Sequence, residues 1–178
     1  MKRSGFKRKS LADIKKQKKL RPIKKAPKSP HKGYKPPKWF NKIKPGSHGS
    51  TPAQKRLWRV VSETYREEDF VKFGPYCPCC GKGFTDWREM HLGHWLRYSL
   101  CNSWMKVERV NLAAICPGCN YLDDAITLQK LGEALKFRYG EDTLLFIEHK
   151  NLEMRGIKME TWAIVDYVAR LRPDLVEN

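Results

Sequence analysis

Four cysteines form two Cys-x-x-Cys pairs in the 178-residue chain: Cys77 and Cys80, then Cys116 and Cys119. Structural zinc is held by four thiolates that two such pairs supply, and the bound ion contributes folding energy. The spacing therefore predicts one structural Zn²⁺ that joins the two ends of the segment 77–119. Gly81 directly follows the first pair, where a glycine lets backbone amides turn toward the sulfur.

Two other metal assignments are open at this point. Cys79 lies inside the first pair, so pairs of Cys79 with Cys77 or with Cys80 are conceivable, although the two-residue spacing before a glycine favours Cys77 and Cys80. A two-Cys, two-His finger uses Cys77, Cys80, His91 and His94. Its histidines are closer than the usual three-to-five spacing, and it leaves the second cysteine pair without a role.

If the four cysteines hold zinc, His91 and His94 remain for other chemistry. Residues three apart on a regular strand face opposite sides, so only one of the two histidines points at a given site unless the strand bulges. Gly93 precedes His94 and permits a ligand to approach the backbone. Asn120 follows the last cysteine, and its carboxamide oxygen suits a hard metal ion. For His94 the ordinary alternative is a packed, hydrogen-bonded structural histidine.

The charge of the chain is concentrated in its first 50 residues. They hold 18 Lys and Arg against the single acid Asp13, whereas residues 51–178 hold 18 basic and 18 acidic residues. A block of like charge with little apolar content is expected to be disordered when free and to bind a polyanion through counterion release. The alternatives are a solubilising tail, or a ribosomal or membrane-surface anchor. The predicted DNA-binding residues are Lys7, Arg8, Lys9, Lys15, Lys16, Lys18, Lys19, Lys24 and Lys25.

Four aromatic residues lie among these charges, and they are expected either to stack on unpaired bases or to anchor the arm on the core: Phe6, Tyr34, Trp39 and Phe40. No apolar run is long enough to span a bilayer, and the first residues lack the apolar segment of a secretory signal. The expected location is intracellular, which favours metal-bound cysteines over disulfides.

The elements that position these residues follow from spacing and from start and stop signals. Thr51-Pro52 starts a helix that runs to about Phe70, with Trp58 more typical of the core than of a binding site. The later elements are expected as a strand at 87–96 that carries both histidines, a loop at 97–106, a short strand at 112–115, and helices at 123–139, 142–149 and 160–171. Asp123 and Asp124 are expected either to start the first of these helices or to join the metal site.

This order predicts an α+β fold: a small zinc-stapled core flanked by helices, preceded by a disordered basic arm. The expected divisions are a nucleic-acid-binding arm at 1–50, an N-terminal helix at 51–75, the zinc-bound core at 76–140, and C-terminal helices at 141–178 that pack on the core.

The ordered motifs resemble the HNH, or ββα-metal, nucleases, and most closely the NinG (Rap) recombination endonucleases of lambdoid phages. The resemblance covers roughly residues 52–172. It comprises the helix motif Leu57-Trp58-Arg-Val-Val-Ser62, the Gly93-His94 pair, the run from Asn111 to Asn120 (Asn-x4-Cys-x-x-Cys-Asn), a helix ending in Tyr139-Gly140, and a final helix beginning Thr161-Trp162.

The resemblance implies a structure-selective DNA endonuclease that acts on junctions or displacement loops. His94 is then the general base, Asn120 helps to hold one Mg²⁺ or Mn²⁺, and Asn111 ties down the loop. His91 stands where the family usually has an aspartate. If the His91 imidazole is the second ligand of the catalytic ion, it favours Mn²⁺ over Mg²⁺, because imidazole is a poor ligand for Mg²⁺. Resolving a symmetric junction needs two cuts, which suggests a homodimer, and a phage-encoded protein acts in the host cytoplasm. The alternative is an inactive zinc-dependent DNA-binding or recombination accessory protein.

Overall fold

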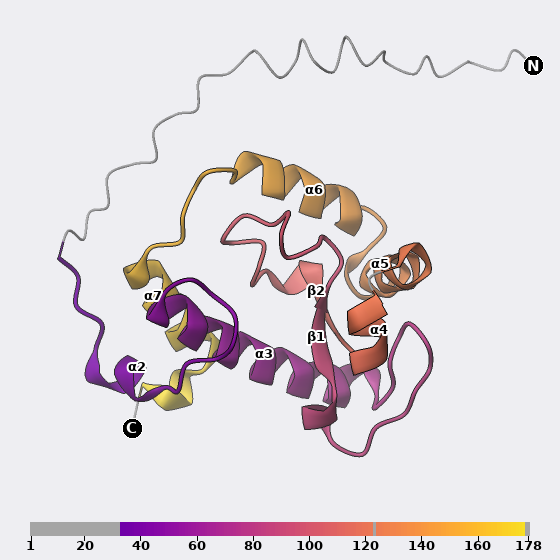
Figure 1. The fold of residues 1–178 in the computed structure, drawn as a ribbon, viewed down its shortest axis with the longest axis horizontal. Coiled ribbons are helices and arrows are strands. Elements are labelled where there is room, and N and C mark those ends of the chain that lie inside the picture. Colours follow the sequence, from indigo (N-terminus) through magenta and orange to yellow (C-terminus); the bar gives the residue numbers. More distant parts are fainter. Residues whose placement is uncertain (1–32, 123, 177–178) are drawn as a thin grey trace, which may run out of the picture.

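The computed structural model describes residues 33–122 and 124–176 and places a two-stranded sheet among helices (Figure 1). The fold class is α+β. The elements are α2 (Lys38–Lys42), α3 (Pro52–Phe73), β1 (His91–His94), β2 (Leu112–Ile115), α4 (Pro117–Leu122), α5 (Ala125–Tyr139), α6 (Thr143–Glu153) and α7 (Thr161–Leu171). Short 3-10 turns occur at Trp87–Glu89, Arg109–Asn111 and Pro173–Leu175.

The long helix α3 begins and ends where the sequence signals predict. The Thr51 hydroxyl accepts the Gln54 N–H at 3.2 Å, and the Gln54 side chain accepts the Thr51 N–H at 3.2 Å, which completes a capping box. Gly74 ends the helix with a φ of 89°, a conformation that favours glycine. The apolar stripe of α3 is buried against α7 and the sheet.

Strands β1 and β2 are antiparallel, and their register sorts the side chains onto two faces. His91 pairs with Ile115, and His94 pairs with Leu112. Because side chains alternate along a strand, His91 and Gly93 belong to one face and Leu92 and His94 to the other. Leu92 packs in a core with α3 and α7, while Ile115 packs in a second core with the cysteines and α5. The hairpin thus separates two cores, and each histidine has its own surroundings.

Residues 33–50 belong to the folded domain, which corrects the expected boundary of the arm at residue 50. Phe40 of α2 is fully buried in the core beside α3, and Trp39 packs against the same core. The Arg56 guanidinium donates to the Ile43 carbonyl at 3.0 Å and holds the segment on α3. Of the two expectations for these aromatics, the structure supports anchoring on the core for Trp39 and Phe40. Phe6 and the arm before residue 33 lie outside the described residues.

Two predicted elements differ from the structure in their extent. The strand expected at 87–96 is limited to His91–His94, because Asp86 accepts the Arg88 N–H and turns Trp87–Glu89 into a 3-10 turn. The helix expected at 123–139 is α5 at Ala125–Tyr139, and a separate short helix, α4, precedes it. Asp124 accepts the Thr127 N–H at 2.6 Å and starts α5, so Asn120 lies within the separate short helix α4.

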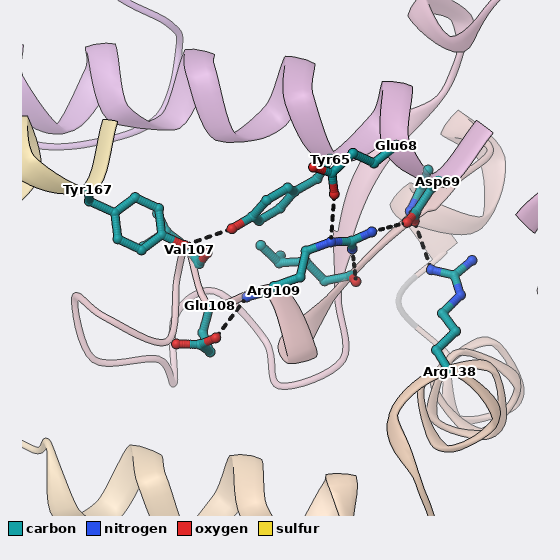
Figure 2. Close-up of polar contacts among 10 residues, drawn as sticks. Tyr65, Glu68, Asp69, Val107, Glu108, Arg109, Arg138 and Tyr167 are labelled. Atoms are coloured by element: carbon teal, nitrogen blue, oxygen red, sulfur yellow. Dashed lines mark hydrogen bonds and ion pairs between the residues drawn. The ribbon is translucent and has the colours of Figure 1, made fainter. Parts of the chain in front are cut away.

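A buried carboxylate joins four segments of the chain (Figure 2). Asp69 of α3 is 2% exposed and contacts the guanidinium groups of Arg109 and Arg138, the latter at 2.7 Å. Its Oδ2 also accepts the backbone N–H of Ala114 in β2 at 2.7 Å. Asp69 thereby fixes α3 to β2, to α5 and to the turn at 109–111.

Candidate metal centre and the two faces of the histidine strand

The first cysteine pair lies in a tight turn. The Gly81 N–H donates to the Cys77 carbonyl at 2.8 Å, and the Cys77 N–H donates to the Lys82 carbonyl at 2.8 Å. Gly81 has a φ of 76°, so the turn needs a residue that tolerates the left-handed region.

The second pair bridges the end of β2 and the first turn of α4. Cys116 follows Ile115 directly, and Cys119 is the third residue of the helix. The Cys119 N–H donates to the Cys116 sulfur at 3.2 Å. Such a hydrogen bond stabilises a thiolate, the form in which cysteine binds metal.

The four sulfurs form one cluster. The Sγ atoms of Cys77, Cys80, Cys116 and Cys119 all lie within 4.8 Å of one another, and Cys80 and Cys116 are 3.7 Å apart. Tetrahedral zinc with Zn–S bonds of about 2.3 Å separates its sulfurs by about 3.8 Å. The cluster therefore fits a structural zinc ion, as the two-pair spacing predicts.

The structure excludes the two other metal assignments. The Cys79 sulfur lies outside the cluster and faces the Thr127 carbonyl at 3.8 Å. The finger that uses both histidines is wrong, because neither His91 nor His94 belongs to a metal-type cluster among the described residues. The second cysteine pair occupies the positions that the finger would give to them.

The thiols of the cluster do not titrate alike. A hydrogen bond from the Cys79 thiol lowers the pKa of Cys77 to about 4. At Cys119, burial and the neighbouring thiol of Cys116 raise the pKa above its usual value. Four thiolates at this separation repel one another unless a cation lies among them. The chemistry of the donor set thus also fits a divalent metal.

His91 and Asn120 lie together between β1 and α4. The Asn120 Nδ2 and the His91 Nδ1 are 3.4 Å apart, and the Tyr121 ring meets the His91 ring edge-on at 5.6 Å. A Cβ at position 93 would clash with the Ile115 side chain and lie 3.4 Å from the Asn120 Oδ1. Glycine at 93 therefore makes room for the Ile115 side chain of β2, and its expected role in letting a ligand approach the backbone stays a prediction.

His94 lies on the other face of β1, away from Asn120. Its ring stacks on Trp58 of α3 at 5.3 Å and 15°, and its Nε2 is 2.9 Å from the Lys106 carbonyl oxygen. Burial lowers the pKa of His94 to about 4, so the ring is neutral at pH 7. The roles that the resemblance implies would bring His94 and Asn120 to one site, but the two lie on opposite sides of β1, because no bulge breaks the regular alternation of the strand.

Asn111 is completely buried and ties the ends of the loop between the strands. Its Oδ1 accepts the Leu96 N–H at 2.8 Å, and its Nδ2 donates to the Met105 carbonyl at 3.0 Å. The same loop supplies Lys106, whose carbonyl oxygen contacts His94. Asn111 thereby positions the segment that fixes the His94 ring.

The remaining predicted site residues have other positions. The basic residues proposed to contact DNA, from Lys7 to Lys25, lie outside the described residues, as does Asp123. Asp124 caps α5, which is the simpler of the two roles expected for it. The sequence did not indicate two further rings of the cluster at His94: Tyr98, which contacts the His94 ring, and His48, which stacks on the other face of Trp58. The aromatic composition of residues 95–104 was the only signal for Tyr98.

Comparisons with known proteins add no family. No family model matches the chain, and neither the curated proteins nor the solved structures include a match. In the part of the chain that the structure describes, no helix has both the length and the apolar character needed to cross a membrane.

Proposed function

We propose that the protein is a metal-dependent endonuclease that acts on branched DNA. The observation that carries this proposal is the imidazole–carboxamide pair of His91 and Asn120, 3.4 Å apart beside the four-cysteine cluster. Regular elements position both side chains. Strand β1 carries His91, and the short helix α4, which contains Cys119, carries Asn120. The branched substrate, and the homodimer that two symmetric cuts require, rest on the resemblance to the NinG endonucleases.

In this proposal His91 and Asn120 hold a divalent ion. Turning the Asn120 amide presents its oxygen toward the His91 ring, so that one nitrogen and one oxygen point at the same position. An imidazole ligand favours Mn²⁺ over Mg²⁺. When bound, the ion acts as a Lewis acid and template for the phosphate.

We assign His94 the role of proton acceptor. Its contacts in the structure determine which ring nitrogen can accept the proton. The Lys106 carbonyl can only accept, so the proton of the neutral ring lies on Nε2 and the lone pair on Nδ1. A phosphodiester that crosses β1 at the edge that does not pair with β2 is the arrangement in which both faces of the strand serve one substrate.

The position of His94 also favours a second candidate function. A ring stacked on Trp58 and turned away from Asn120 suits a structural histidine. The protein is then a zinc-dependent DNA-binding or recombination accessory protein without cleavage activity.

A cleavage assay on linear duplex, flap, displacement loop and four-way junction, each with Mg²⁺, Mn²⁺ or neither, separates the two. The endonuclease proposal expects nicking of branched substrates with Mn²⁺. Asn120→Ala and His94→Ala are each expected to slow it by about 10²- to 10⁴-fold, the range for losing a catalytic group, at unchanged junction affinity. Exposed Glu133→Ala in α5 is the matched control.

Each outcome of this assay has a distinct meaning. Binding without nicking under any condition supports the accessory protein. Nicking that survives in His94→Ala but not in Asn120→Ala removes His94 from the chemistry and keeps the site between β1 and α4.

Deleting residues 1–32 is expected to flatten the salt dependence of DNA binding. The deletion removes 14 Lys and Arg and one acid, and each lost phosphate contact reduces the slope of log K against log salt by about 0.9. The slope is measured by fluorescence anisotropy at salt concentrations from about 50 to about 300 mM. An arm of the same composition in scrambled order should restore it. An unchanged slope after deletion contradicts a phosphate-binding arm.

A further inference from the structure

A cavity of about 940 Å³ lies on the His94 side of the hairpin, away from the His91–Asn120 pair. Its walls come from the segment before α3, from α3 itself, from the loop between the strands, and from the start of α7. Five aromatic rings line it: Tyr34, His48, Trp58, Tyr98 and Trp162. Ligand pockets of about 300–1,000 Å³ accommodate small molecules, and they are lined largely by hydrophobic and aromatic side chains.

The rings are already arranged in a stack. His48 lies on Trp58 at 5.2 Å and 19°, and Trp58 lies on His94 at 5.3 Å and 15°. Tyr98 closes the side of this stack and meets both histidine rings nearly at right angles, at 87° and 85°. His48 is exposed at the outer end, so the stack ends in a flat aromatic face. A planar heteroaromatic group continues such a stack at little cost.

The charges of the cavity favour an anion beside that planar group. Lys106 and Lys158 line it, and the Lys106 ammonium lies 4.1 Å from the centre of the Tyr98 ring. Glu160 is the one acidic residue among the described lining residues, and its carboxylate accepts the Trp162 indole N–H at 2.9 Å. The lining also includes Gly33, which directly follows the 32 residues that hold 14 Lys and Arg. The basic arm therefore joins the domain at the rim of the cavity.

From these observations we infer that the cavity binds an unpaired nucleotide of a DNA strand, with the base stacked on the outer face of His48, which Trp58 supports from behind, and the phosphate at Lys106 and Lys158. The inference rests on the nucleic-acid partner of the proposed function but not on cleavage. It gives a physical reason for selecting branched DNA, because unpaired bases occur at branch points and are absent from intact duplex.

The test uses the full chain with its zinc and a single strand that carries one 2-aminopurine, without added Mg²⁺ or Mn²⁺. Stacking of 2-aminopurine on the outer face of His48, at the end of the ring stack, is expected to quench its fluorescence. Trp58→Leu removes the ring on which His48 rests and is therefore expected to reduce the quenching and to weaken single-strand binding by up to about 5- to 150-fold, the range for one base stacked on an aromatic ring. Duplex affinity, which the arm provides, should stay unchanged.

Two further variants keep the test decisive if the Trp58→Leu chain does not fold. His48→Ala removes an exposed ring from a loop and should reduce quenching and single-strand affinity at an unchanged melting temperature. Phe137→Ala removes an aromatic side chain, 88% exposed, from α5 and should change neither. A 2-aminopurine mononucleotide distinguishes a strand site from a site for free nucleotides, and the inference expects much weaker binding of the mononucleotide.

Three outcomes overturn the inference. One is a folded, zinc-loaded chain whose single-strand binding is the same with and without the His48 and Trp58 rings. Another is a mononucleotide that binds as tightly as the strand. The third is quenching that occurs only after residues 1–32 are deleted, which makes the arm the natural occupant of the cavity. Quenching without any nicking leaves this inference standing and contradicts only the endonuclease.

Discussion

Cys116→Ser is expected to unfold the domain. Cys116 is buried, its sulfur lies 3.7 Å from that of Cys80, and it accepts the Cys119 N–H. A structural zinc ion contributes about 10–16 kcal/mol in zinc-finger peptides, which equals or exceeds the whole stability of about 5–15 kcal/mol of an ordinary domain. Serine is a poor zinc ligand, so the variant should lose the ion, the cooperative thermal transition and the near-ultraviolet circular dichroism signal.

The controls for this prediction come from the other cysteines and from ligand chemistry. Cys101→Ser alters a buried cysteine outside the cluster, and a hydroxyl there can still donate to the Leu96 carbonyl, so the fold should persist. Cys116→His restores an accepted zinc ligand and should recover part of the zinc content. The wild-type chain should release one zinc ion per chain in a colorimetric assay. A Cys116→Ser chain that melts normally without zinc contradicts a structural metal.

The turns at the two Cys-x-x-Cys pairs were predictable because the interactions that form them are local. Two residues between cysteines and a following glycine set each turn, and four thiolates have one common use in a small fold. The start of α3 was predictable for the same reason, since Thr51 and Pro52 act on adjacent backbone groups. The helix predicted at 123–139 is observed as α5, whereas the separate helix α4 before it was not predicted, because six residues are too few to show a periodic apolar pattern.

The surroundings of the histidines could not be read from the sequence. The alternation rule predicts that His91 and His94 face opposite sides, but it does not say which face α4 covers. That choice depends on the packing of Leu92 against α3 and of Ile115 against the cysteine core. His48 approaches Trp58 only because residues 33–50 fold back on α3, although their composition predicts an unfolded arm.

The spacing of residues along α3 indicates that Asp69 is buried, although the overall charge pattern of the chain does not. Leu57, Val61, Tyr65 and Asp69 recur every four residues along α3, so the carboxylate falls on the apolar stripe. A buried charge at such a position requires partners, and no local rule identifies Arg109 and Arg138 as those partners. They meet Asp69 because β2 and α5 pack against the end of α3 (Figure 2).

Asp69→Asn is therefore expected to destabilise the zinc-loaded domain by about 3–5 kcal/mol, the cost of breaking a buried ion pair from one side. The amide keeps the shape of the carboxylate but leaves the Arg138 guanidinium, whose side chain is 5% exposed, without a counter-charge. Urea unfolding at saturating zinc measures the free energy of unfolding. Glu63→Gln is the matched control, because it breaks a partly exposed pair with Arg59 on the same helix and should cost about 0–1 kcal/mol. A loss within about 1 kcal/mol for Asp69→Asn contradicts the structural role of this carboxylate, whereas a loss in the expected range shows that α3 is fixed to β2 and α5 by charge as well as by apolar packing.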